Sequence, residues 1–246
     1  MIKFGLIGNP VEHSASADYF NKKFEQQGSE DRYELFQLSK IEELEQLLDE
    51  QPHLIGLNVT SPFKVKVINY LDTLDEEAEY IGAVNTIKIV NEDGIKTLKG
   101  YNTDVIGFAE SIRPYTKGKS RALVLGTGGA AMAVVRAFDK LYIETTLVSR
   151  NPQKEDILSY EDLHNKDLAF YDFIVNATPV GMDKDKEECP QIDYSQINSS
   201  HICYDLIYNP EKTLFLEKAE KQGAKILNGI EMLYKQAEEA YLCWTK

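Results

Sequence analysis

Short apolar runs alternate with amphipathic segments along the chain. In the first half, this pattern predicts strands at 2–7, 33–37, 54–59 and 83–90, and helices at 15–27, 41–51 and 64–70. Leu44, Leu47 and Leu48 recur at helical spacing in the second of these helices, and acidic residues occupy the opposite face. The turn sequence Asn-Glu-Asp-Gly at 91–94 predicts a hairpin between the strand at 83–90 and another at 95–98.

The second half continues with strands and helices in alternation. We expect strands at 121–125, 145–149, 173–176, 202–205 and 225–227, and helices ending at 112 and covering 130–141, 213–222 and 230–244. Strands that alternate with helices indicate parallel βαβ units, so the predicted fold class is α/β. A boundary at 100–104, between the hairpin and a new helix, predicts two domains.

Composition limits the possible partners. A length of 246 residues fits two domains of ~100–200 residues each. The net charge of −13 argues against a nucleic-acid binder or a protein of anionic membrane surfaces. The apolar start breaks at Asn9-Pro10, too early for a signal segment, and no apolar run is long enough to span a bilayer. With three scattered cysteines and no CxxC, we expect a cytoplasmic protein without a bound metal.

A glycine-rich turn joins the strand at 121–125 to the next helix. Gly126 allows a tight turn, Gly128 lets the backbone approach a pyrophosphate, and Ala131 permits close packing of helix on strand. The free N–H groups at the helix start would then face the phosphates. The alternative is a βα turn that binds nothing. A P-loop is excluded, because no Gly-Lys-Ser/Thr follows.

The end of the following strand indicates the type of dinucleotide. An NAD site needs a carboxylate at this strand end, whereas Glu144 stands at the start of the strand. Ser149 is instead followed by Arg150 and Lys154, which can neutralise a 2′-phosphate. The sequence therefore predicts NADP rather than NAD, and the alternative is an ordinary solvated basic pair.

Polar residues also gather at the strand ends of the first half. Ser14 and Ser16 stand near a helix start, where hydroxyl and N–H groups can hold a carboxylate, or where one serine can simply cap the helix. Asn58 and Thr60 close the strand at 54–59, and Lys64 follows one turn into the predicted helix. Ligands of open α/β sheets bind at such carboxyl ends. Without these neighbours, the simplest interpretation of Lys64 would be an exposed helix lysine that binds no ligand.

A lysine near a carboxylate can exchange a proton with an alcohol. Asp104 follows the hairpin and could merely cap the next helix. Together, Lys64 and Asp104 provide a general acid–base group and a carboxylate that orients it, which is what hydride chemistry at an alcohol requires.

These motifs in combination resemble the shikimate dehydrogenase family. The resemblance extends from Gly8 to Gln236. Its motifs are HSxS at 13–16, NVTxPxK at 58–64, NTD at 102–104, GxGG at 126–129, NATPxGM at 176–182 and MLxxQ at 232–236. Membership would imply reversible NADPH-dependent reduction of 3-dehydroshikimate to shikimate, a step of aromatic amino acid biosynthesis.

The resemblance also implies roles for the matching residues. Lys64 and Asp104 would be the catalytic pair. The substrate-binding residues would be Ser14 and Ser16 for the carboxylate, Asn58, Thr60, Asn85 and Gln236 for the ring hydroxyls, and Tyr208. The cofactor-binding residues would be Gly126, Gly128, Gly129, Ala130, Ser149, Arg150, Lys154, Asn176, Thr178 and Gly229.

The family architecture would place a substrate-binding domain at 1–102, completed by the final helix at 229–246, and a Rossmann-like NADP-binding domain at 103–228, with the active site between them. We expect a small-molecule enzyme that is a monomer or a homodimer. Ala17, Phe20 and Glu231 depart from the family motifs. The open alternatives are a quinate dehydrogenase paralogue, a methylene-tetrahydrofolate dehydrogenase of similar architecture, and a non-catalytic NADP sensor.

Overall fold

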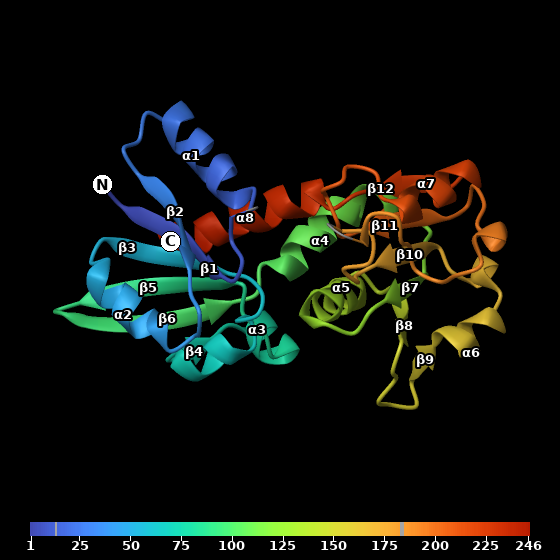
Figure 1. Ribbon diagram of the computed structural model, residues 1–246, viewed down its shortest axis with the longest axis horizontal. Helices are drawn as coiled ribbons and strands as arrows, with labels where there is room; N and C mark the ends of the chain where they lie inside the picture. Colours follow the sequence, from blue (N-terminus) through green and yellow to red (C-terminus); the bar gives the residue numbers. More distant parts are fainter. Residues whose placement is uncertain (13, 183–184) are drawn as a thin grey trace. The chain divides into compact units, whose positions relative to one another are not determined.

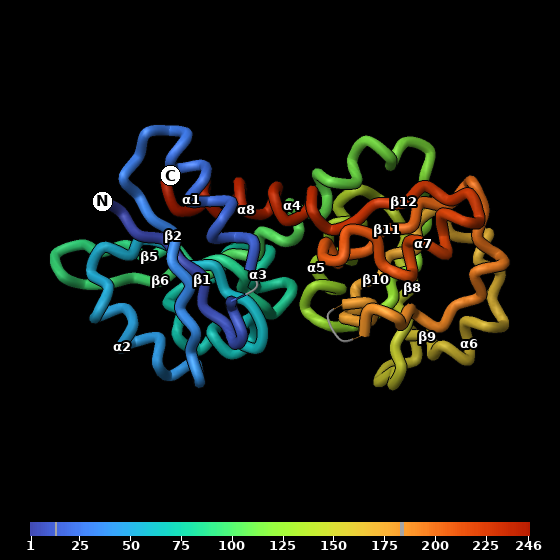
Figure 2. Tube along the Cα trace, turned by 45° about the horizontal axis from the view of Figure 1, so that its top comes forward, coloured from blue at the N-terminus to red at the C-terminus, as the bar shows by residue number. Residues whose placement is uncertain are grey.

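The computed structural model describes residues 1–12, 14–182 and 185–246, and the chain divides into two compact units (Figures 1 and 2). The first unit comprises Met1–Thr103 and Gln236–Lys246, and the second comprises Asp104–Lys235. The last helix, α8 (Ile230–Thr245), contributes residues to both units. The α/β class expected from the sequence is confirmed.

The first unit is built on a mixed six-stranded sheet in the order β2-β1-β3-β5-β6-β4. Its strands are β1 (Lys3–Gly8), β2 (Arg32–Gln37), β3 (Leu54–Val59), β4 (Thr73–Leu74), β5 (Thr86–Glu92) and β6 (Ile95–Tyr101). Strand β1 pairs in parallel with β2 and β3, whereas β5 is antiparallel to both β3 and β6. The predicted hairpin is therefore confirmed as β5–β6, although β5 begins later than expected, at Thr86.

Both faces of this sheet are covered. Strand β1 alternates, so that Phe4 and Leu6 join one apolar cluster and Ile7 joins the other. The first cluster also contains residues of α1 (Ser16–Gln26) and of the end of α8. The second contains Leu44 and Leu47 of α2 (Glu43–Glu50), as their helical spacing predicts. A short helix, α3 (Glu76–Ile81), follows β4.

One predicted element has a different form. The segment expected to be a helix at 64–70 is a 3₁₀ helix at Lys66–Tyr70, so Lys64 lies in the turn before it. The segment is short and contains three β-branched residues, which lower the preference for an α-helix. The position of Lys64 one turn into a helix was therefore wrong.

The second unit contains a parallel six-stranded sheet in the order β12-β11-β10-β7-β8-β9. Its strands are β7 (Arg121–Leu125), β8 (Glu144–Ser149), β9 (Ile157–Ser159), β10 (Phe173–Asn176), β11 (Ile202–Asp205) and β12 (Lys225–Leu227). Counted within the unit, this is the strand order 3-2-1-4-5-6 of the Rossmann fold. The order reverses between β7 and β10, and ligands of such sheets bind at the carboxyl ends of the strands at this point.

Helices flank both faces of this second sheet. Phe108 of α4 (Asp104–Ile112) and Phe138 of α5 (Gly129–Lys140) are in ring contact, and Phe138 also contacts Phe173 of β10. The next residue of β10, Ile174, belongs to the apolar cluster that includes residues of α6 (Tyr160–His164) and α7 (Leu214–Lys221). Burial on both faces is typical of an all-parallel sheet.

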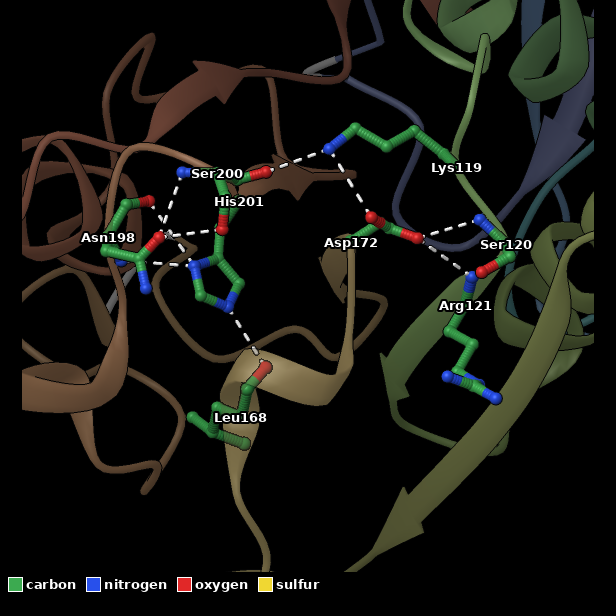
Figure 3. A network of polar contacts seen from close by, with 8 residues as sticks. All are labelled: Lys119, Ser120, Arg121, Leu168, Asp172, Asn198, Ser200 and His201. Atoms are coloured by element: carbon green, nitrogen blue, oxygen red, sulfur yellow. Dashed lines mark hydrogen bonds and ion pairs between the residues drawn. The ribbon is translucent and has the colours of Figure 1, made fainter.

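The amino ends of these strands are held by a polar network (Figure 3). Asp172 accepts hydrogen bonds from the backbone N–H groups of Ser120 (2.7 Å) and Arg121 (3.1 Å), and Lys119 lies 3.4 Å from its carboxylate. Burial raises the pKa of Asp172, but these hydrogen bonds and the Lys119 charge outweigh it and leave the pKa below its ordinary value. The network thus anchors β7 and β10 at the edge opposite the predicted ligand site.

The buried side chain of His201 belongs to the same region (Figure 3). The backbone N–H of Asn198 donates to its Nδ1 (3.1 Å), so Nε2 carries the proton and donates to the carbonyl of Leu168 (3.0 Å). Both ring nitrogens of His201 therefore hold loops in place.

In the described part of the chain, no helix is long and apolar enough to cross a bilayer.

Candidate active-site residues

Five polar side chains of the first unit form a buried hydrogen-bonded network. It joins the end of β3 to the start of β5, to the loop between β6 and α4, and to α8. Its members are Asn58, Asn85, Thr86, Thr103 and Gln236. Asn58 donates to Thr86 (3.1 Å), Asn85 donates to Thr103 (3.0 Å), and Thr103 donates to Gln236 (3.4 Å). Segments far apart in sequence thus bring together three predicted substrate ligands, Asn58, Asn85 and Gln236.

Tyr33 of β2 extends this network and was missed by the sequence analysis. Its hydroxyl donates to Asn58 Oδ1 (2.7 Å), and its ring stacks on Phe20 at 4.7 Å between centroids. Burial raises the pKa of Tyr33 well above its ordinary value, and a hydrogen bond with Ser16 lowers it in part. Tyr33 therefore lies between Ser16, predicted to bind a carboxylate, and Asn58, predicted to bind a hydroxyl.

The predicted serine pair stands at the start of α1. The N-cap residue is Ala15, whose side chain makes no capping hydrogen bond. Ser14 Oγ instead accepts from the backbone N–H of Ser16 (3.3 Å). His13, the first residue of the motif, lies outside the described residues. The two serines are thus adjacent at a helix start, and their role toward a carboxylate stays a prediction.

The departures from the family motif have structural roles in α1. Phe20 is fully buried in the aromatic cluster, and Ala17 packs against the same cluster. Asn21 exchanges hydrogen bonds with the backbone of Tyr33, donating to its carbonyl (2.9 Å) and accepting from its N–H (2.8 Å). These residues attach α1 to β2 and so position Tyr33.

Thr60 and Lys64 follow β3 and are half-buried. The backbone N–H of Thr60 donates to Ile7 of β1 (2.9 Å). The carbonyl of Lys64 accepts from the backbone N–H of Val84 (2.8 Å), which places the Lys64 backbone next to the residue before Asn85. Asp104 is the first residue of α4 and belongs to the second unit. Its negative charge suits a helix N-terminus. The pairing of Lys64 with Asp104 stays a prediction.

The glycine-rich turn of the second unit fits a dinucleotide. Gly126 has φ +116°, and a Cβ there would lie 3.0 Å from the carbonyl oxygen of Ala177. Gly128 is the N-cap of α5, with no side-chain cap bond, and a Cβ on it would meet no heavy atom of the described residues within 4 Å. Gly129 and Ala130 begin the helix, whose N–H groups suit a phosphate. The space next to Gly128 is therefore open to a ligand.

Asn176, at the end of β10, uses its whole amide within the unit. Its Nδ2 donates to the carbonyl of Val180 and to Asp205 (both 3.1 Å), and its Oδ1 accepts from the N–H and hydroxyl of Thr178. An asparagine amide has two donor and two acceptor positions. The side chain of Asn176 is thus saturated, so that any contact of this residue with a cofactor would come from its backbone.

Asp205, at the end of β11, accepts a hydrogen bond from the side chain of Asn176 in the neighbouring strand. Its carboxylate accepts from the hydroxyl of Thr213 (2.6 Å) and from the backbone N–H of Ile207 (3.0 Å), in addition to Asn176. Burial raises the pKa of Asp205 to about 6, although these hydrogen bonds oppose the shift. Asp205 therefore joins the carboxyl ends of two neighbouring strands.

The predicted basic pair lies between β8 and β9. Arg150 and Lys154 are exposed, and Ser149 Oγ accepts from the N–H of Asn151 (3.2 Å). Ser149 pairs with Ser159, so Arg150 stands beside Tyr160 at the carboxyl edge of the sheet. Burial raises the pKa of Tyr160, and the Arg150 charge lowers it in part. Both readings of the pair, a phosphate site and a solvated pair, stay open.

Tyr208 and Gly229 complete the predicted site. Tyr208 is half-buried after β11. A Cβ on Gly229 would lie 2.0 Å from the carbonyl oxygen of Leu206, so a close approach of two backbone segments already requires glycine there. Glu231, the other departure from the family motifs, is exposed in the first turn of α8.

Known proteins match the chain over nearly its full length. The family described as shikimate dehydrogenase substrate binding domain matches residues 6–87. Shikimate dehydrogenase (NADP(+)) of Caldanaerobacter subterraneus subsp. tengcongensis is 39% identical, over 98% of this chain and 91% of that relative. The chain belongs to the shikimate dehydrogenase family.

Solved structures of the family share both the fold and its extent. The chorismate mutase/shikimate 5-dehydrogenase fusion protein from Clostridium acetobutylicum has a TM-score of 0.88 at 35% identity, covering 100% of this chain and 91% of that chain. The shikimate 5-dehydrogenase of Thermus thermophilus, in complex with NADP(H) and shikimate, has a TM-score of 0.85 at 33% identity, covering 100% and 94%. The resemblance noted in the sequence is thus confirmed.

Proposed function

We propose that the protein catalyses the reversible NADPH-dependent reduction of 3-dehydroshikimate to shikimate. The observation that carries this proposal is family membership at 39% identity over 98% of the chain, combined with the buried network that joins Asn58, Asn85 and Gln236. A network of amide and hydroxyl groups suits a small polyhydroxylated ring, because each ring hydroxyl can both donate and accept.

In this proposal the first unit binds the substrate. Ser14 and Ser16 bind the carboxylate, and the ring hydroxyls are bound by Asn58, Thr60, Asn85 and Gln236; Tyr208 is a further substrate-binding residue. Lys64 exchanges a proton with the oxygen on C3 of the substrate, and Asp104 provides the carboxylate that orients and stabilises the Lys64 ammonium. NADP(H) supplies or accepts the hydride.

The second unit holds the cofactor. Gly126 and Gly128–Ala130 offer backbone N–H groups to the pyrophosphate, and the backbone of Asn176 and Thr178 lines the adjacent strand end. The 2′-phosphate would be bound by Ser149, Arg150 and Lys154, and Gly229 would contact the nicotinamide. We also infer that the enzyme acts in the cytoplasm, as a monomer or a homodimer, on small molecules and not on nucleic acids.

An NADPH absorbance assay with shikimate and quinate, each against NADP and NAD, tests the reaction. We expect the highest kcat/KM with shikimate and NADP. Higher efficiency with quinate would identify the paralogue, and no turnover with either acid would overturn the proposal.

Two variants test the residue roles. Lys64→Ala should lower kcat by at least about 100-fold with a small change in KM, because the proton transfer is made in the transition state. Lys66→Ala, at an exposed position two residues later, is the matched control and should behave as wild type. The serine double variant Ser14→Ala/Ser16→Ala should mainly raise KM for shikimate; an unchanged KM would remove the carboxylate role.

A further inference from the structure

The amide of Asn58 is held in one orientation. Its Nδ2 lies 3.2 Å from the backbone carbonyl of Asn85, which can only accept, so the nitrogen must face it. The second N–H of Nδ2 goes to Thr86 Oγ1 (3.1 Å), and Oδ1 accepts from the Tyr33 hydroxyl (2.7 Å). An amide oxygen has two acceptor positions. Asn58 therefore keeps one acceptor position for a ligand and no donor.

The amide of Asn85 is also held in one orientation, but here the acceptor positions are used and a donor is left over. Its Oδ1 accepts from the backbone N–H of Thr103 (2.8 Å), which can only donate, and from the hydroxyl of Thr86 (3.1 Å). Both acceptor positions are then used. Its Nδ2 gives one N–H to Thr103 Oγ1 (3.0 Å) and keeps the other. Asn85 therefore offers a ligand one donor.

Thr86 is the residue that connects the two amides. Its fully buried hydroxyl accepts from Asn58 (3.1 Å) and donates to Asn85 Oδ1 (3.1 Å), and it also lies 3.3 Å from the hydroxyl of Thr103, a longer contact in which either oxygen can donate. We propose that Thr86 is a positioning residue, which makes Asn58 an acceptor and Asn85 a donor toward the substrate. Because this rests on the proposed function, in which both amides bind ring hydroxyls, the experiment below separates the two.

This polarity has a chemical consequence for recognition. A hydroxyl can donate to Asn58 and accept from Asn85, whereas a ketone or ether oxygen can only accept. A ketone oxygen in contact with Asn58 would leave a buried acceptor unpaired, which is costly. Without the Thr86 hydroxyl, Asn58 regains a free N–H and can donate to a ligand as well as accept from it, which weakens its selectivity for a donating group. Asn85 Oδ1 then keeps the N–H (2.8 Å) and the hydroxyl (3.2 Å) of Thr103 as donors.

The test uses Thr86→Val, which removes the hydroxyl and keeps the branched shape. KM for shikimate should rise roughly three- to tenfold, the effect of about one net hydrogen bond, with a smaller change in kcat and an unchanged KM for NADP. The ratio of kcat/KM for shikimate to that for monodeoxy analogues, which lack one of the two hydroxyls that are not oxidised, should fall. Thr86→Ser should restore both properties, and Thr97→Val, at an exposed position of β6, is the matched control.

The outcomes distinguish this proposal from the proposed function. If Asn58→Ala and Asn85→Ala leave KM for shikimate unchanged, the assignment of these residues as ligands fails. If they raise KM but Thr86→Val keeps the wild-type KM and discrimination, the role of Thr86 is overturned. Should Thr86→Val not fold, Thr86→Ser must keep the wild-type KM and Thr86→Ala must raise it; equal values, or a Thr86→Ser variant that does not fold, would contradict the proposal.

Discussion

Replacing Gly56 by alanine should displace Trp244 and weaken the first unit. Gly56 lies in β3, and a Cβ there would come 2.4 Å from Cδ1 and Cγ of the indole of Trp244. The indole is buried, and its Nε1 donates to the carbonyl of Ile87 in β5 (2.9 Å). Ordinary contact begins near 3.4 Å, so the ring must move by about one ångström and lengthen this hydrogen bond.

The expected loss follows from three contributions. Overpacking of a dense core costs about 1–3 kcal/mol, and the weakened hydrogen bond costs about 1 kcal/mol. Alanine regains about 0.5–1 kcal/mol, because glycine in a strand interior is unfavourable. We therefore expect Gly56→Ala to lower the free energy of unfolding by about 1–3.5 kcal/mol.

Trp244 is the single tryptophan of the chain, so its fluorescence during urea unfolding follows the first unit. The displaced helix end should also raise KM for shikimate, because α8 carries Gln236. In a Trp244→Phe background, followed by circular dichroism, the cost of Gly56→Ala should largely disappear. A free energy of unfolding within about 0.5 kcal/mol of wild type, or an equal loss in both backgrounds, would refute this reasoning.

Three further changes test the second unit. Gly128 has an ordinary φ of −79°, and within the described part of the chain no atom lies within 4 Å of a new Cβ, so Gly128→Ala should keep the wild-type Tm but raise KM for NADP at least about tenfold by blocking a phosphate; unchanged NADP kinetics would count against the site. Arg150→Glu should lower kcat/KM about 10- to 100-fold with NADP and much less with NAD, and equal losses with both cofactors would leave only a solvated basic pair. Asp205 has a pKa raised to about 6 by burial, against an ordinary value of 3.8, so the folded state binds more protons between these values. Its contribution to stability is complete below about pH 4 and falls by about 3 kcal/mol as the pH rises from about 4 to about 6, so Asp205→Asn should flatten the dependence of Tm on pH in this window, and an unaltered slope would contradict the assignment.

Most of the fold can be predicted from the sequence, because the spacing of hydrophobic residues and the residue types of turns are visible within short stretches of the chain. The strands at Leu54–Val59, Arg121–Leu125 and Lys225–Leu227 have the predicted bounds. The missed elements are short: β4 has two residues and β9 has three, too few to show a period. Two helices that were not predicted, α3 and α6, begin with capping residues that the sequence shows. Asp75 caps α3, and Ser159 with Asp162 forms a capping box at the start of α6.

The candidate site could be predicted by residue type but not by contact. Asn58 and Asn85 stand out as polar residues at strand ends, whereas Tyr33 reads as an ordinary strand aromatic. Its hydroxyl reaches Asn58 from β2, with β1 between their strands. Such a contact depends on sheet order and register, which no local pattern contains. The saturation of Asn176 likewise depends on Asp205, from the neighbouring strand.

In the proposed binding mode, the two amides of the buried network, Asn58 and Asn85, also determine which inhibitors can bind. Exchanging a ring hydroxyl at Asn58 for an amino group would preserve a proton to give to Oδ1, whereas a fluorine or a methoxy group would offer none. At Asn85 the preference reverses, since Nδ2 retains the N–H. A mimic bearing the same substituents in exchanged positions would therefore bind more weakly, although its size and overall polarity are unchanged.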